Sequence, residues 1–392
     1  MTRHLKEEKK DGSRNFYGRF ELNNTPRQFP ENTMTKRKTI TFLLPSPARV
    51  PAGGYKVAYE YANRLVADGH KVNVVYAGSL FFAKKTAYFK MTNCVRYVQS
   101  RVAGFSARKW FPLDKRVHEH LAFSLNDRHV PKSDIYIATS PYTAMYLKEY
   151  PVDGQRKFYF IQDYENWGNV TDEMLLATYH YDLRKIVISN WLQRIIESHG
   201  LECTLIPNGF NFDYFHLKTP IEKKDKYRIT MLYHTMERKG CRYGFEALAI
   251  VKAKFPQLRV NLFGVPARPE GLPEWYEYHR CPDAKTHNRL YDEAALFLGT
   301  SNIEGWGLTV GEAMICGQTV VCTDNAGYRE MALHERTALV SPVKDPEELA
   351  RNLIRLIEDD TLRWRVAAEG HRFIQQFTWE KSYQKFKALL EA

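Results

Sequence analysis

Apolar residues along most of this chain fall into two alternating patterns. Runs such as residues 39–44 and 71–76 are mostly apolar and β-branched, which is typical of strands buried on both faces of a parallel sheet. Between these runs, apolar residues from Val57 to Val66 recur with the 3.6-residue period of a helix that packs on a core. The pattern predicts a strand–helix–strand crossover, the unit that builds parallel sheets.

The same alternation continues to the end of the sequence. Further buried strands are predicted at residues 134–139, 157–161, 185–188, 203–206, 228–233, 260–263, 295–299 and 319–323. Helices are predicted at residues 143–150, 191–199, 243–255, 286–294, 310–315, 346–358, 361–377 and 379–390. Residues 268–285 show no such pattern and are predicted to form an irregular loop. The fold class is therefore α/β.

A chain of 392 residues with this pattern favours two domains. Residues 1–37 are polar and aperiodic, which predicts a flexible N-terminal arm. A Lys-rich linker is expected between two α/β domains, followed by a final helix that packs back on the first domain. The predicted boundaries are 38–216 for the first domain, 217–227 for the linker, 228–378 for the second domain and 379–392 for the helix.

One stretch, residues 300–330, combines features that suit an anionic ligand. It follows a predicted strand, passes through Gly305 and Gly307, and enters a helix whose first N–H groups lack helical partners. Two carboxylates, Glu304 and Glu312, flank this site, and they suit hydroxyl groups better than phosphate. A sugar nucleotide offers both a diphosphate and hydroxyls. An ordinary strand–loop–helix unit, with Glu312 facing the helix dipole, explains the same spacing equally well.

These residues resemble the Glu-x7-Glu signature of glycosyltransferase family 4. The match runs without a gap through Glu304-Gly305-Trp306-Gly307-Leu308, Glu312-Ala313-Met314, Gly317 and Val320-Val321. A weaker resemblance extends from about residue 38 to the C-terminus. The resemblance implies a GT-B fold, in which two Rossmann-like domains face each other across a cleft and the C-terminal one holds the donor nucleotide.

The resemblance also implies roles for these residues. Glu304 would hold the hydroxyls of the transferred sugar, and Glu312 those of the ribose. N–H groups around Gly307, Leu308 and Thr309 would bind the diphosphate, and Gly305 and Trp306 belong to the same donor-binding loop. The family retains the anomeric configuration by front-face attack, with the leaving phosphate as base, so no protein nucleophile is assigned.

Three further positions complete the predicted site. Arg238 and Lys239 follow the predicted strand 228–233, where two cations can bind a diphosphate; a surface charge pair is the alternative. The backbone at Gly264 can approach a base or a phosphate. Gly53-Gly54 resembles the family's opening segment, where the backbone approaches the substrate cleft, although a tight turn would also require glycine.

Residues 162–167, Gln-Asp-Tyr-Glu-Asn-Trp, follow another predicted strand. They resemble a loop at the cleft of bacterial rhamnosyltransferases of the same family, which makes L-rhamnose the favoured sugar. Asp163 is the catalytic candidate in this loop. Many members of the family carry a histidine near this position, so the role of Asp163 departs from the general pattern.

Composition narrows the class of protein. The formal charge of +12 suits nucleic acid, an anionic membrane or a phosphorylated substrate, but no nucleic-acid-binding motif is present. Basic and aromatic residues mix at 101–123, which suits either an anionic membrane surface or a solvated helix with a buried aromatic side. No apolar run reaches membrane-spanning length, and the charged N-terminus is unlike a secretory signal. Scattered cysteines favour the cytoplasm.

The sequence predicts a cytoplasmic glycosyltransferase, peripheral at the inner face of the cell membrane. The resemblance implies that it would be retaining. No usable D-x-D motif or zinc spacing occurs, so it is predicted to be metal-independent and to need no cofactor besides its nucleoside-diphosphate sugar donor. The acceptor would be a glycan or a lipid-linked molecule of bacterial surface polysaccharide synthesis. The alternatives are a GT-B epimerase or hydrolase of nucleotide sugars, and a non-catalytic GT-B partner subunit.

Overall fold

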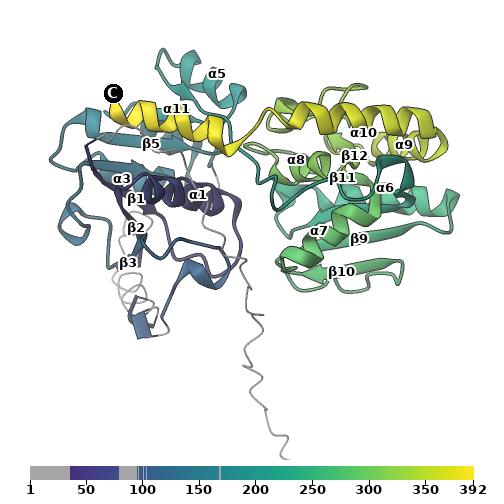
Figure 1. Cartoon of the computed structure of the whole chain (residues 1–392), viewed down its shortest axis with the longest axis horizontal. Coiled ribbons are helices and arrows are strands. Elements are labelled where there is room, and N and C mark those ends of the chain that lie inside the picture. The colour runs from purple at the N-terminus through teal and green to yellow at the C-terminus, as the bar shows by residue number, and fades with distance from the viewer. Residues whose placement is uncertain (1–35, 79–94, 96, 100, 103, 167–168) are drawn as a thin grey trace, which may run out of the picture. The chain divides into compact units, whose positions relative to one another are not determined.

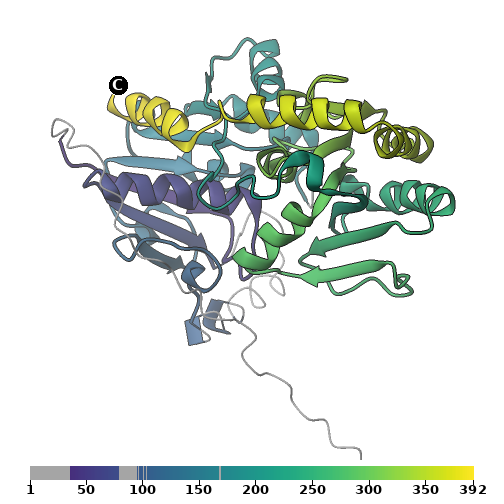
Figure 2. The ribbon, with the colours of Figure 1, turned by 45° about the vertical axis from the view of Figure 1, so that its right-hand side comes forward.

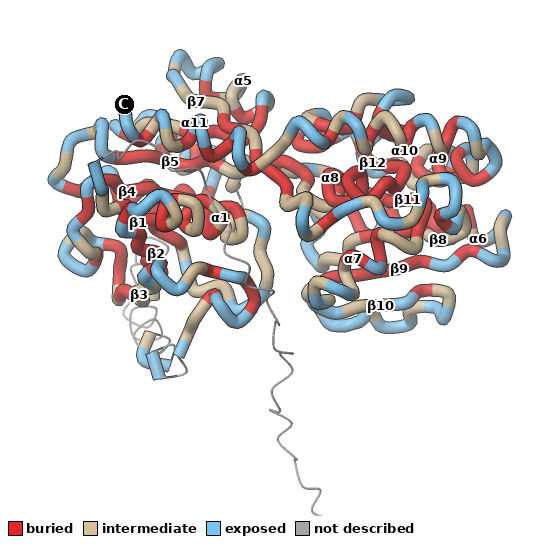
Figure 3. Tube along the Cα trace, viewed as in Figure 1, coloured by how far each residue is buried: buried red, intermediate tan, exposed pale blue. Residues whose placement is uncertain are grey.

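The computed structural model describes residues 36–78, 95, 97–99, 101–102, 104–166 and 169–392 (Figure 1). Apart from its last two residues, the predicted arm at 1–37 lies outside this described part. The described residues contain two parallel sheets, with buried residues concentrated in the strands and in the helices beside them (Figure 3). Each sheet is built by the crossovers that the sequence predicts.

Within the described residues, the first sheet has seven parallel strands in the order β3-β2-β1-β4-β5-β6-β7. Its strands are β1 (Thr39–Leu44), β2 (Lys71–Ala77), β3 (His118–Ala122), β4 (Ile135–Ala138), β5 (Lys157–Ile161), β6 (Arg184–Val187) and β7 (Thr204–Leu205). Its helices are α1 (Gly53–Ala67), α3 (Pro141–Leu147), α4 (Asp172–Tyr179) and α5 (Asn190–Ser198). Strand β1 pairs with both β2 and β4, so its carboxyl end lies centrally in the sheet.

The second sheet has six parallel strands in the described chain, in the order β10-β9-β8-β11-β12-β13. Its strands are β8 (Asp225–Tyr233), β9 (Arg259–Gly264), β10 (Tyr276–Arg280), β11 (Ala294–Gly299), β12 (Thr319–Thr323) and β13 (Ala338–Ser341). Its helices are α6 (Cys241–Lys254), α7 (Ala284–Glu293), α8 (Leu308–Ile315), α9 (Pro346–Glu358) and α10 (Asp360–Ile374). Short 3₁₀ turns occur at Ala107–Lys109, Asp127–His129, Gly154–Arg156, Ile221–Lys223, Glu237–Lys239 and Tyr328–Glu330.

The last helix, α11 (Trp379–Glu391), lies along α1 of the first sheet in both views (Figures 1 and 2). The Phe386 ring stacks on Tyr61 with 4.1 Å between the ring centroids. The Tyr383 hydroxyl donates to Asp68 over 2.8 Å, and the Lys387 ammonium lies 2.7 Å from the same carboxylate. Apolar packing and a shared carboxylate thus hold the C-terminal helix on α1.

The structure corrects several expectations about secondary structure. Residues 268–285 are not wholly irregular, because β10 lies within them, and β3, β13 and α4 were not expected. Strands β3 and β10 are at sheet edges and read His-Glu-His-Leu-Ala and Tyr-Glu-Tyr-His-Arg. An edge strand is covered less than a central one, so it lacks the continuous apolar run of a buried strand. Strand β8 begins at Asp225, inside the range predicted as linker.

The mixed basic and aromatic segment at 101–123 also differs from expectation. Among its described residues, Arg101 and Val102 are helical, Ala107–Lys109 form a 3₁₀ turn and His118–Ala122 form β3. The part from residue 104 onward is therefore not the solvated helix that was one of the two expectations. Trp110 and Phe111 are buried, and both rings lie against Tyr59 of α1. Arg108 pairs with Glu119 at 2.5 Å. Because these rings belong to the core, they are not available to a lipid surface. None of the helices in the described ranges is both long and apolar enough to cross a bilayer.

Candidate functional site

The candidate site lies where β8 and β11 of the second sheet end at their carboxyl edge. The loop after β11 leads through Gly307, the N-cap residue of α8, which has φ of 96°. Glycine tolerates this left-handed conformation and has no side chain that could cap the first N–H groups of the helix. The N-terminus of α8 is therefore available to an anion, as its glycine loop predicts.

The two loop glycines each permit a close contact. A Cβ added to Gly307 would lie 2.5 Å from the Tyr328 ring, and one added to Gly305 would lie 2.0 Å from the backbone oxygen of Gln162. The Tyr328 ring is buried and lies against the loop. The glycine at 305 lets the loop approach the segment that follows β5.

Lys239 and Glu304 form the central ion pair of the site. The Lys239 Nζ lies 2.6 Å from Glu304 Oε1, and the Ser301 hydroxyl donates to the same oxygen over 2.7 Å. Lys239 sits in the 3₁₀ turn after β8, and its backbone oxygen accepts a hydrogen bond from Thr300. The segments that follow β8 and β11 are thus linked, and Lys239 and Glu304 come together although they are 65 positions apart in the chain.

Arg238, although adjacent to Lys239, takes a different partner. Its guanidinium lies 2.6 Å from Asp163 and donates to the backbone oxygen of Ile303 over 3.1 Å. Burial raises the pKa of Asp163, even though the charge of Arg238 opposes the shift. Burial also raises the pKa of Glu165 well above its usual range, with the Asp163 charge adding to the shift. The segment after β5 therefore presents two carboxyl groups that hold protons more readily than usual.

Glu312, the second carboxylate of the predicted signature, lies on α8 and is buried. It accepts a hydrogen bond from the Tyr291 hydroxyl over 3.0 Å. Burial raises its pKa to about 7, while the Lys56 charge and the Tyr291 hydrogen bond act in the opposite direction. Near neutral pH this side chain can either donate a proton or accept a hydrogen bond.

The remaining predicted residues differ in how closely they lie to the site residues described above. Gly54 lies beside it, because its backbone oxygen accepts from the Gln162 side chain over 3.2 Å. A Cβ on Gly53 would touch the Leu308 side chain at 3.4 Å, and Thr309 follows in the first turn of α8. The Trp306 ring instead packs inward, against Phe377.

Gly264 lies at the end of β9, at the same edge of the sheet. A Cβ at this position would lie 2.2 Å from the backbone oxygen of Tyr233, so strand packing alone already requires a glycine. No contact recorded among the described residues joins Gly264 to Glu304.

Several contacts of the site were not predicted. Ser301 and Tyr291 bond to the two carboxylates, and Lys56 acts on Glu312 by its charge alone. Trp191 donates from its indole nitrogen to the Gly305 backbone oxygen over 3.1 Å. Of these residues, Ser301 lies in the predicted stretch 300–330, and Trp191 begins the predicted helix 191–199.

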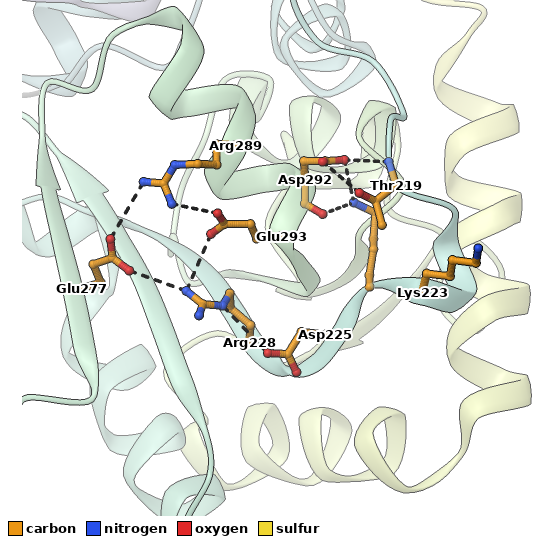
Figure 4. Close-up of a pocket in the computed structure, with 9 residues that line it drawn as sticks. Thr219, Lys223, Asp225, Arg228, Glu277, Arg289, Asp292 and Glu293 are labelled. Atoms are coloured by element: carbon orange, nitrogen blue, oxygen red, sulfur yellow. Dashed lines mark hydrogen bonds and ion pairs between the residues drawn. The ribbon is translucent and has the colours of Figure 1, made fainter.

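A cavity of about 410 Å³ lies at the opposite edge of the second sheet, where β8 begins (Figure 4). It is lined by Thr219, Lys223, Lys224, Asp225, Arg228, Glu277, Arg289, Asp292 and Glu293. Most of these charges already have partners, including Arg228 with Glu277 at 3.6 Å and Arg289 with Glu293 at 2.8 Å. We assign the site to the carboxyl edge, where an uncapped helix adds hydrogen-bonding capacity that this cavity lacks.

A second cavity, of only about 10 Å³, lies at that carboxyl edge and is lined by Lys239, Ser301, Thr309 and Tyr328 among others. In this structure, the cations and carboxylates of the site fill the space by pairing with one another. No group of three or more His, Cys, Asp or Glu residues in the described ranges is arranged to bind a metal ion.

Part of the chain matches a known protein family. Residues 228–359 match the family described as Glycosyl transferases group 1. The matched part of the chain holds most of the second sheet and α8. The chain is also 24% identical over 210 residues to phosphatidyl-myo-inositol mannosyltransferase of Mycobacterium tuberculosis, covering 50% of this chain and 56% of that protein. It thus spans about half the length of this curated relative.

Solved structures confirm the fold class. HepE of Anabaena in complex with UDP and glucose has a TM-score of 0.67 at 16% identity, covering 90% of this chain and 99% of that chain. Sucrose-phosphate synthase of Thermosynechococcus elongatus has a TM-score of 0.66 at 16% identity, covering 90% and 98%. The chain has the predicted α/β GT-B fold, with two Rossmann-like parallel sheets.

Proposed function

We propose that this protein is a glycosyltransferase that moves a hexose from a nucleoside-diphosphate sugar to a glycan or lipid-linked acceptor. The observation that carries the proposal is the Lys239–Glu304 pair beside the uncapped N-terminus of α8. A cation and free N–H groups suit a diphosphate, and a carboxylate beside them suits sugar hydroxyls. The family match at residues 228–359 supports the same donor class, as does the UDP bound in the HepE structure.

The donor would replace contacts that the protein now makes with itself. Its diphosphate would take Lys239 and the N–H groups of Leu308 and Thr309. Glu304, released from Lys239, would accept hydrogen bonds from the transferred sugar. Glu312, which already accepts a hydrogen bond from Tyr291, would do the same for the ribose.

The transfer step would break the bond between the anomeric carbon and the phosphate oxygen, and form a bond between that carbon and the acceptor oxygen. The acceptor proton would pass to the departing phosphate, with retention of configuration and no protein nucleophile. Lys239, Arg238 and the α8 N–H groups would stabilise the negative charge that develops on the leaving diphosphate, which is commonly the largest catalytic contribution. No step uses a metal ion.

Asp163 would position the sugar or the acceptor rather than attack it. The Arg238 guanidinium holds it 2.6 Å away, so its direction is fixed by a charged hydrogen bond. The loop Gln162 to Glu165 is also the basis for proposing L-rhamnose as the sugar and bacterial surface polysaccharide as the product. We also propose a cytoplasmic location at the inner face of the membrane. Because the rings of Trp110 and Phe111 are buried, other residues would make the contacts with the membrane surface.

A thermal-shift panel with UDP, dTDP, GDP and ADP tests the donor class. A ligand that binds only the folded protein raises its stability by about 2.7 kcal/mol at a hundredfold excess over the dissociation constant. We expect one diphosphate to raise Tm clearly in the wild type and much less in Lys239→Ala. Consumption of the matching sugar donor without any acceptor would favour an epimerase or hydrolase. No shift with any of the four would contradict the proposal.

A further inference from the structure

A histidine in the first turns of α7 has no place in the site described so far. The Nε2 atom of His287 is buried and has no hydrogen-bond partner within the described part of the chain. Buried polar atoms without partners are uncommon in folded proteins, and each one needs an explanation. An atom of this kind at the ligand edge of a sheet is a candidate for a ligand contact.

The position of His287 fits that explanation. Helix α7 begins just after β10, so its first turns lie at the carboxyl edge of the second sheet, where ligands of parallel sheets bind. Its ring centroid lies 4.7 Å from that of Phe263, the penultimate residue of β9, and 5.0 Å from that of Tyr291. The Tyr291 hydroxyl in turn bonds Glu312, so one tyrosine connects the histidine to the second carboxylate of the site.

The chemistry of the surroundings is mostly aromatic. Phe215 completes the group, with its ring centroid 5.4 Å from that of His287. Burial lowers the pKa of His287 to about 3, and the Lys56 charge adds to this effect. The imidazole is therefore neutral at physiological pH, and each ring nitrogen can donate or accept one hydrogen bond, depending on the tautomer.

An aromatic wall with a single neutral hydrogen-bonding atom suits a flat heteroaromatic ring. It does not suit a phosphate, which would require a cation or several N–H groups, or a free sugar, which would require several polar partners. The groups that approach His287 from other segments are Phe215 and, through its charge, Lys56 of α1. Phe263 and Tyr291 belong to β9 and α7 of the second sheet.

We infer that His287 binds the nucleobase of the donor through its Nε2 atom and thereby contributes to the choice of base. This inference rests on the proposed function, since it assigns a part of the same donor. A site built around a hydrogen bond discriminates against ligands that leave its polar group unpaired. His287 would thus act on the selection of the donor and not on the transfer step itself.

The test compares wild type with His287→Leu, which removes the polar atom, and His287→Gln, which keeps an amide near the position of Nε2. Calorimetry would measure Kd for UDP, dTDP, GDP and ADP, and for inorganic pyrophosphate as a probe of the diphosphate subsite. His287→Leu is expected to raise Kd for the preferred nucleoside diphosphate by about three- to tenfold, the effect of one neutral hydrogen bond. The Kd of this variant for pyrophosphate should not change. Its Kd values for the four nucleoside diphosphates should differ less from one another than those of wild type.

The control is Asn288→Leu, on the same helix. Asn288 is also buried, and its side chain donates to the backbone oxygen of Tyr214, so this change disturbs α7 without removing the proposed base contact. It should lower Tm and leave the base preference intact. His287→Gln should retain more of the preference than His287→Leu, and with a sugar donor the loss should appear in KM rather than kcat.

Two results would overturn the inference, and they are distinguishable from failure of the proposed function. If wild type binds one nucleoside diphosphate and folded His287→Leu shows the same ratio of Kd values, His287 does not contact the base. If the variants weaken pyrophosphate as much as the nucleoside diphosphate, the role of His287 is structural. If wild type binds none of the four, the proposed function fails and the inference fails with it.

Discussion

The two edges of the second sheet both gather cations and carboxylates, but they differ in how completely those charges are satisfied. At the edge where β8 begins, Lys224 is fully buried and lies 3.5 Å from Asp292, with a backbone oxygen of the same residue 2.7 Å away. At the edge where β8 ends, Lys239 pairs with Glu304 beside a helix terminus that no side chain caps. The larger cavity belongs to the first edge.

In this protein, cavity volume and unused hydrogen-bonding capacity indicate different edges of the second sheet. The charges around the larger cavity bond to one another and to backbone oxygens, which is how a structural network connects strands and helices. At the other edge, the N-terminus of α8 has no side-chain cap, and a sugar nucleotide could give Lys239 an anionic partner and Glu304 hydroxyl donors. The candidate site is therefore the edge with unused hydrogen-bonding capacity.

The largest expected effect follows from removing the cation at the ligand edge. Lys239→Ala deletes the point charge assigned to the diphosphate and should raise Kd for the preferred nucleoside diphosphate by about 10- to 100-fold, as for a charge-assisted hydrogen bond. Calorimetry at fixed ionic strength measures the change.

Lys223→Ala is the matched control for this prediction. Lys223 is exposed at the rim of the larger cavity, so its loss should leave Kd unchanged. Equal weakening by the two variants would mean that net positive charge, and not the position of Lys239, holds the diphosphate.

A smaller effect, on stability, is expected at the opposite edge. Asp292→Ala leaves the buried ammonium of Lys224 without its carboxylate and should lower the free energy of unfolding by about 3 kcal/mol, in the range for breaking a buried pair. Denaturant unfolding measures this change.

The double variant Asp292→Ala with Lys224→Met also removes the Lys224 ammonium, which has no carboxylate partner in the single variant. The double variant should therefore recover part of the lost free energy of unfolding. Nucleoside diphosphate affinity of the folded variants should equal that of wild type. A loss of affinity greater than that of Lys239→Ala would reverse the assignment of the two edges.

Some parts of the structure could be predicted from the sequence, and others could not. Central strands such as β1 and β11 are buried on both faces, so their continuous apolar runs made them predictable. Edge strands such as β3 and β10 could not be recognised, because partial exposure permits polar residues. Glu304 and Lys239 were predicted to lie in the same site, since each follows the end of a predicted strand. The contact between Tyr291 and Glu312 depends on tertiary packing that no local pattern encodes. The domain boundaries and the roles of the site residues stay predictions.

The smallest expected effect concerns pH. The folded-state pKa of Glu312, about 7, lies above the value of 4.5 for a free glutamate, so the folded protein binds more protons than the unfolded chain between these values. Glu312 should therefore make stability fall as pH rises from about 4.5 to 7, by an amount on the order of 1–3 kcal/mol. Unfolding curves across this range measure the slope.

Glu312→Gln should flatten that slope, because the amide does not titrate. Tyr291→Phe should steepen it, because the lost hydrogen bond is one of the effects that lower the pKa. An unchanged slope in Glu312→Gln would show that Glu312 is not the group that binds the extra proton.

The most direct test of the central claim is amide hydrogen exchange of the wild-type protein with and without the nucleoside diphosphate that gives the largest thermal shift. The account predicts protection at residues 237–241 and 303–310, which contain Lys239, Glu304 and the first turn of α8. It predicts no protection at residues 219–228, which line the larger cavity. Protection confined to residues 219–228 would contradict the assignment of the donor site to the carboxyl edge of the sheet.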